Sequence, residues 1–72
     1  MRYRFHIKSD GRIYWDEGGE NFATAADALK HGSVIAHELD DGSFASGFSV
    51  SIVDENDMEI GSVPIAAKRS PN

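Results

Sequence analysis

Residues 2–8, RYRFHIK, alternate cationic or titratable side chains with apolar ones. Side chains along a strand alternate between two faces, so this spacing predicts an apolar face towards a core and a basic face towards water or a partner. A basic row beside an aromatic ring can contact phosphates or stack on a base, as the open sheets of some RNA-binding modules do. The candidate binding face, continued across the next turn, is Arg2, Arg4, His6, Lys8, Arg12 and Tyr14.

The net charge weighs against a nucleic-acid partner. The chain carries −5 overall, but residues 1–14 hold four cations and one acid (+3), whereas residues 15–72 hold three cations and eleven acids (−8). Carboxylates on neighbouring strands could also neutralise the basic row, which would then be only the solvated side of a sheet. We therefore expect a protein partner, or a second copy of this dipolar chain, before nucleic acid.

No group of residues has the spacing of a catalytic or metal site. His31 and His37 lie six apart, so on a helix they would not converge on one ion as an i, i+4 pair does. Residues 54–59 begin like a calcium loop but place Met and Glu where an oxygen ligand and glycine belong. Gly18-Gly19 lacks the lysine and further glycine of a phosphate loop. We predict no enzyme activity, no catalytic residues, no cofactor and no metal.

The elements that must position the basic row are a hairpin and a helix. Asp10-Gly11 is a turn signal between two alternating stretches, so residues 2–15 are predicted to form a β-hairpin. Residues 16–21 contain no apolar side chain and are predicted to form a mobile surface loop, which Phe22 closes by entering the core. Thr24 and Asp27 have the spacing of a helix cap, and apolar residues then recur at helical spacing to Leu39.

A second hairpin follows the helix. Residues 44–53 and 58–65 are predicted strands joined by a polar turn, with a bulge at Gly61 and an edge position at Pro64. A helix of about 15 residues rises about 22 Å, one strand length, and so returns the chain to the opposite end of the sheet. The prediction is an α+β domain, ββαββ, with a four-stranded antiparallel sheet of order 2-1-3-4 and one helix on one face. Residues 1–65 form this single domain, and residues 66–72 form a disordered tail.

The predicted core combines apolar residues from every element. Gly32 lies within the apolar stripe of the helix, so we expect it to mark the closest approach of helix and sheet. The core residues are predicted to be Phe5, Ile7, Trp15, Leu29, Ile35, Phe48, Val50 and Ile52.

Composition predicts the compartment. The chain has no cysteine, which fits a reducing cytoplasm, and no apolar run long enough to span a bilayer. We expect a cytoplasmic protein without a membrane partner.

The order of these features resembles a family of short bacterial proteins of uncharacterised function. The resemblance covers residues 2–65, departs from the family pattern at Asn56-Asp57 and Gly32, and implies no known activity or site residue. Its motifs here are Arg2-Tyr3-Arg4-Phe5-His6-Ile7, Asp10-Gly11, Asp16-Glu17-Gly18-Gly19-Glu20, Ala25 to Leu39, Val53-Asp54-Glu55-Asn56-Asp57 and Val63-Pro64. From the residues we expect a small protein-binding or regulatory module, with self-association as one form of that binding and weak RNA or single-stranded DNA binding as the alternative.

Overall fold

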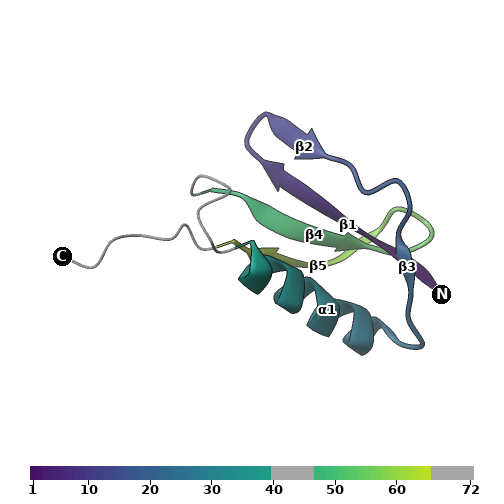
Figure 1. Cartoon of the computed structure of the whole chain (residues 1–72). Coiled ribbons are helices and arrows are strands. Elements are labelled where there is room, and N and C mark those ends of the chain that lie inside the picture. Colours follow the sequence, from purple (N-terminus) through teal and green to yellow (C-terminus); the bar gives the residue numbers. More distant parts are fainter. Residues whose placement is uncertain (40–46, 66–72) are drawn as a thin grey trace.

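The alternating residues near the start of the chain form the longest strand of an antiparallel sheet. The computed structural model describes residues 1–39 and 47–65. One helix packs on one face of the sheet (Figure 1). The elements are β1 (Arg2–Ser9), β2 (Arg12–Tyr14), β3 (Glu20–Asn21), α1 (Ala25–Glu38), β4 (Ser49–Val53) and β5 (Glu59–Pro64).

The sheet has the predicted class and one strand more than predicted. Its order is β2-β1-β4-β5, which is the predicted order of the four expected strands, and β3 also pairs with β1. The bulge is confirmed beside Gly61, because Ile52 faces Gly61 while Val53 faces Glu59. Pro64 ends the edge strand, as predicted. The predicted strand start at Phe44 and the predicted tail 66–72 lie outside the described residues.

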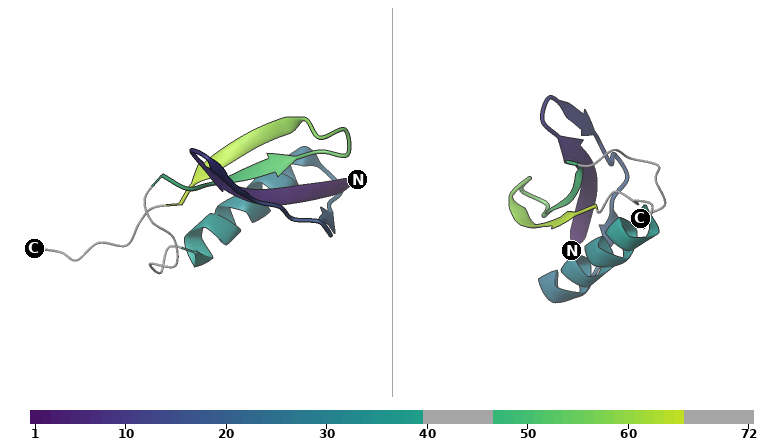
Figure 2. Two further views of the ribbon diagram at one scale, coloured as in Figure 1. Left: turned by 90° about the horizontal axis from the view of Figure 1, so that it is seen from above. Right: turned by 90° about the vertical axis from the view of Figure 1, so that its left-hand side faces the viewer.

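The helix begins and packs as its sequence predicts. The Thr24 hydroxyl accepts a hydrogen bond from the Asp27 N–H at 3.1 Å, which caps the first turn. Ala28, Gly32 and Ala36 are buried against the sheet. Val34, on the opposite side, is exposed. Figure 2 shows that the helix covers one face of the sheet and leaves the other face uncovered.

Gly32 is a point of closest approach between helix and sheet. A Cβ atom at this position would lie 2.7 Å from Cδ1 of Ile52, which is fully buried on β4. Real Cβ atoms essentially never come that close to another heavy atom. The absent side chain therefore sets the helix-to-sheet distance.

Replacing Gly32 by Leu should destabilise the fold. Helix propensity alone would favour Leu by about 1 kcal/mol, but overpacking against the fully buried Ile52 side chain costs about 1 to 3 kcal/mol or more. Urea unfolding should show the loss, whereas Ser33→Leu, on the exposed neighbouring position, should change stability little. A Gly32→Leu chain more stable than the parent would contradict the packing described here.

The core prediction is correct except at Trp15. Val50 and Ile52 are fully buried and Phe5 is 7% exposed, while Ile7, Leu29, Ile35 and Phe48 pack around them partly buried. Phe22 also packs against this cluster, as predicted. Trp15, however, is 66% exposed.

The reason is the length of the first turn. Ser9 faces Arg12 across the two-residue turn, so Lys8 faces Ile13. Residues paired across strands share a face, and a two-residue turn therefore places odd-numbered residues of β2 beside even-numbered residues of β1. Ile13 and Trp15 consequently lie on the face away from the core.

Candidate functional site

The sheet face opposite α1 carries a hollow with a volume of about 520 Å³. Arg4, His6 and Lys8 of β1 contribute to it, and on the adjacent β4 the residue facing His6 is Ser51. Ile13 of β2 and Trp15, which directly follows β2, supply an apolar wall, and the turn before β5 and the start of β5 each supply a carboxylate. The hollow is lined by Arg4, His6, Lys8, Ile13, Trp15, Asp16, Glu17, Ser51, Val53, Asp57 and Glu59.

The structure does not bring the six residues of the predicted binding face together on one surface. Arg12 and Tyr14 lie on the opposite face, because Tyr14 pairs with Ile7 in the register of the hairpin. The Tyr14 ring stands 6.2 Å from that of Phe48, and the Arg12 guanidinium donates to the Tyr14 hydroxyl at 3.4 Å. A continuous face from Arg2 to Tyr14 was therefore the wrong expectation.

Arg2 is the third of the six that does not line the hollow. Its guanidinium donates to the Gly18 carbonyl oxygen, and its backbone N–H donates to Glu55 Oε2 at 3.1 Å. It holds the loop after β2 and the β4–β5 turn against the start of β1. Only Arg4, His6 and Lys8 therefore come together at the hollow.

Both cations of the hollow face carboxylates. Arg4 Nη1 lies 3.5 Å from Asp57 Oδ1, and Lys8 Nζ lies 3.3 Å from Glu59 Oε1. The Ser51 hydroxyl also donates to Glu59, and this hydrogen bond, followed by Lys8, lowers the pKa of the Glu59 carboxyl. Carboxylates therefore neutralise both cations, as the sequence analysis considered for the basic row.

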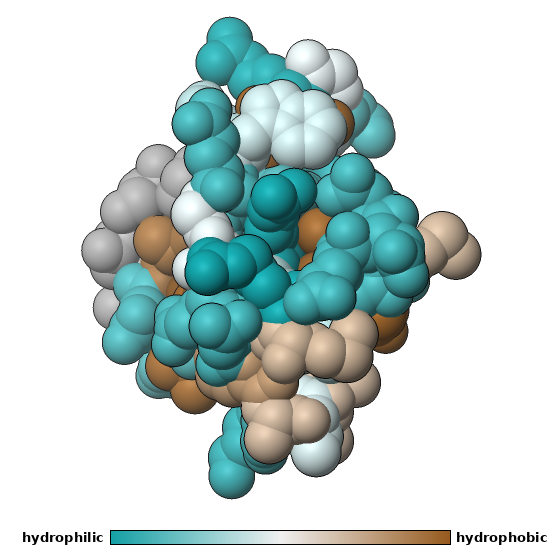
Figure 3. All heavy atoms as spheres, turned by 90° about the vertical axis from the view of Figure 1, so that its right-hand side faces the viewer, coloured by the Kyte–Doolittle hydropathy of each residue, from teal (hydrophilic) through white to brown (hydrophobic). Residues whose placement is uncertain are grey.

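The lining as a whole is acidic. It holds two cations and four carboxylates, a net charge of −2 with His6 neutral. The end of the molecule that carries the β4–β5 turn is also mostly hydrophilic (Figure 3). The basic residues of β1 therefore line a hollow whose net charge is negative.

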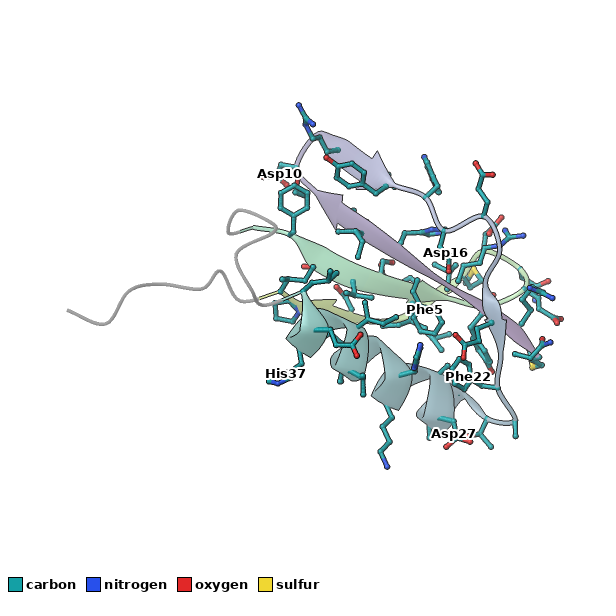
Figure 4. All side chains as sticks on the ribbon, in the orientation of Figure 1. Phe5, Asp10, Asp16, Phe22, Asp27 and His37 are labelled. Atoms are coloured by element: carbon teal, nitrogen blue, oxygen red, sulfur yellow. The ribbon has the colours of Figure 1, made fainter. Side chains whose placement is uncertain are left out.

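Asp16 completes the edge of β1 between its two short partners. β2 pairs with residues 7–9 of β1 and β3 pairs with residues 2 and 3, which leaves a gap. Asp16 Oδ2 accepts a hydrogen bond from the Phe5 N–H at 3.1 Å, and its Oδ1 accepts one from the Gly19 N–H at 3.1 Å. Figure 4 shows Asp16 at β1 on the side towards β2, whereas Phe5 and Phe22 lie towards α1.

The loop that contains Gly18 and Gly19 has a defined conformation. Gly19 has φ +71°, and a Cβ there would lie 2.7 Å from the Tyr3 carbonyl oxygen, so glycine is required by both backbone conformation and contact. Glu20 and Asn21 then form β3. The surface loop expected over residues 16–21 is therefore shorter than predicted, because residues 20 and 21 pair with the edge of β1.

His6 forms the buried floor of the hollow. It is 7% exposed, and its Nδ1 accepts a hydrogen bond from the Asp16 N–H at 3.0 Å. Its ring meets that of Trp15 edge-on, with centroids 4.8 Å apart. Burial lowers the pKa of His6 below its ordinary 6.5, with a smaller opposing effect from Asp16. The expectation that His6 faces solvent was wrong.

The stability of the domain should fall as the pH drops below about 6.5. Unfolded His6 takes up a proton near that pH, whereas the folded ring resists it, because it is buried and Nδ1 must remain an acceptor. The contribution is thus complete above the unfolded pKa and is lost as the pH falls towards the folded pKa. Urea midpoints measured between about pH 5 and pH 8 should show this loss for the parent.

Two variants assign that pH dependence to one ring. His6→Asn keeps an acceptor near Nδ1 but cannot titrate, so it should lose the fall. His37→Gln, on the exposed side of α1, should keep it. A His6→Asn chain with the same pH profile as the parent would contradict the assignment.

The other two histidines do not meet. His31 packs edge-on against Phe5 with ring centroids 5.2 Å apart, and its Nε2 lies 3.4 Å from Glu20 Oε1. His37 is exposed in the last turn of α1.

Among the described residues, no helix is long and apolar enough to cross a membrane.

Comparison with known families places the chain. The family described as a domain of unknown function, DUF6894, matches residues 2–66. The chain belongs to the DUF6894 family. No curated protein and no solved structure matches it. The resemblance inferred from the sequence is therefore confirmed as membership of a family without an assigned function, and the matched DUF6894 region contains every residue of the hollow.

In this DUF6894 domain, sequence reasoning missed the apolar wall of the hollow and the role of Asp16 beside it. Trp15 was assigned to the core, Ile13 was not assigned to the binding face, and Asp16 was assigned to a mobile loop. The length of the Asp10-Gly11 turn was the available signal, because it fixes the register and hence the faces of β2. Nothing in the local sequence indicates the hydrogen bonds that Asp16 makes to β1.

Proposed function

We propose that this DUF6894 domain is a small cytoplasmic protein-binding module that holds its partner in the hollow of the open sheet face. The observation that carries this proposal is the exposed apolar wall of Trp15 and Ile13, 66% and 44% exposed, beside charged side chains over a concave surface. Tryptophan in such surroundings is typical of residues that dominate protein interfaces. We assign binding, and no catalytic step, to this face.

Nucleic acid is the less supported partner. Phosphate binding requires cations that are available to phosphates, and both cations of the hollow already face carboxylates. The remaining lining adds two further acids, Asp16 and Glu17. A polyanion would meet repulsion there, whereas a protein segment could use the apolar wall.

The proposal is tested by affinity capture from a lysate of the cells that express the protein. The immobilised parent is compared with a double variant, Ile13→Ser with Trp15→Ser. The control is Val34→Ser on the outer side of α1, where the side chain is about as exposed as that of Ile13. Each capture is run with and without nuclease. We expect the same bound protein on the parent and the control, at least about ten-fold less on the double variant, and no effect of nuclease.

Two results would contradict the proposal. One is a bound protein retained equally by the parent and the double variant, since binding would then use another surface. The other is capture that nuclease abolishes, which would make nucleic acid the partner. Circular dichroism of the double variant must match that of the parent, as expected for replacements of exposed side chains.

A further inference from the structure

One carboxylate of the hollow has no partner among the residues that the structure describes. Asp57 and Glu59 face cations, and both oxygens of Asp16 accept backbone hydrogen bonds. Glu17 is exposed and makes no hydrogen bond or ion pair within residues 1–39 and 47–65. The unbalanced negative charge of the lining therefore includes a carboxylate that is free to meet a ligand.

An aromatic surface lies two residues before that carboxylate. Trp15 lines the same hollow, and although His6 contacts its ring, two thirds of the residue remains exposed. The face of an indole ring attracts cations, and it does so more strongly than the other aromatic rings. Trp15 and Glu17 can therefore both attract the same positively charged group.

The floor of the hollow adds a hydrogen-bond donor. Because Nδ1 of His6 accepts the Asp16 N–H, the neutral ring carries its proton on Nε2. No hydrogen bond joins Nε2 to any described residue, and no buried side-chain nitrogen or oxygen in the described part lacks a partner. Nε2 therefore reaches the open space of the hollow, where it can donate to a carbonyl oxygen.

We propose that the hollow binds an arginine-bearing segment of a partner protein, an inference that rests on the proposed function and names its ligand chemistry. The planar guanidinium stacks on Trp15 and donates to the Glu17 carboxylate, while His6 Nε2 donates to a backbone carbonyl of the same segment. Arginine fits better than lysine because its flat, forked cation can stack and donate at once. We commit to a separate protein as the occupant, and a second copy of the chain is one of the outcomes that the sedimentation experiment tests.

Trp15 provides the test, because it is the single tryptophan of the chain. Its fluorescence is followed while acetyl-Leu-Arg-Leu-amide, or the same peptide with citrulline in place of arginine, is added. Citrulline keeps the shape and removes the charge. We expect a saturable change with the arginine peptide and at least about five-fold weaker binding of the citrulline peptide, the effect of losing about 1 kcal/mol.

Variants locate the charge preference. Glu17→Gln should weaken the arginine peptide towards the citrulline value and leave citrulline binding unchanged. Glu38→Gln, an exposed acid at the end of α1, should leave both affinities unchanged. The same affinity for both peptides, or no change in Trp15 emission up to about 10 mM peptide, would overturn the inference.

These results are separable from a failure of the proposed function. Capture that depends on Ile13 and Trp15, together with equal binding of both peptides, would reject the arginine inference alone. Sedimentation of the parent by itself is expected to show a monomer. A dimer that Arg12→Gln dissociates would make a second copy the occupant and would overturn the choice of a separate partner.

Discussion

Replacing Ile52 by Ala should lower the free energy of unfolding by about 2 to 5 kcal/mol, the range for deleting a large aliphatic side chain from a core. Ile52 is fully buried, pairs with Phe5 on β1 and lies beneath Gly32 of α1. It therefore touches both layers of the domain. A chain of this length has a total stability of about 4 to 11 kcal/mol, so the variant should lose a large fraction of it.

Urea unfolding followed by circular dichroism measures this loss. Val34→Ala is the matched control, because it also shortens an aliphatic side chain but at an exposed position of α1, and it should change stability by less than about 0.5 kcal/mol. If Ile52→Ala were as stable as the Val34 control, the sheet face that packs against the helix would be wrongly assigned.

Replacing Asp16 by Ala should cost about 2 to 4 kcal/mol, an unusually large effect for a loop residue. The change removes the acceptors of two backbone N–H groups, those of Phe5 and Gly19. Hydrogen bonds to a charged group contribute about 1.5 to 3 kcal/mol each, and because both of these bonds are only partly buried we take about 1 to 2 kcal/mol for each. The Phe5 N–H lies in the gap between β2 and β3, so no neighbouring strand can replace the lost bond.

Asp16→Asn tests whether the hydrogen bonds explain the loss. Its single amide oxygen can accept one of the two bonds, so its stability should lie between those of the parent and Asp16→Ala. Glu17→Ala, one residue on and exposed, should have little effect on unfolding. Equal stabilities of Asp16→Ala and Glu17→Ala would show that the loop is not fastened through Asp16.

The fold could be predicted from the sequence where periodicity is strong. Alternation in residues 2–8, the capped apolar stripe of the helix and the glycine at position 32 each have a direct local cause. They also agree with one another, and such agreement between local and overall structure is what allows a fold to be inferred. The order of the strands followed because the helix spans one strand length.

The candidate site could be predicted only in part, for two physical reasons. The first is the register of the hairpin. The two-residue Asp10-Gly11 turn places the odd-numbered residues of β2 beside the even-numbered residues of β1, so Trp15 lies at the hollow and Tyr14 on the opposite side. The second is the distance in sequence between residues that are in contact. The bonds from Asp16 to β1 and the pairing of Arg4 with Asp57 join residues distant in sequence, and alternation along one strand carries no information about them.

NMR can map where the partner touches the domain and so test directly whether the open sheet face is the binding surface. The protein captured from the lysate is purified and added to the ¹⁵N-labelled chain, and backbone amide shifts are followed by NMR. We predict that the largest changes fall at His6, Trp15, Glu17 and Ser51, all of which line the hollow. Changes concentrated instead on the outer side of α1 around Val34, with the hollow unaffected, would contradict the claim that the open sheet face is the binding surface.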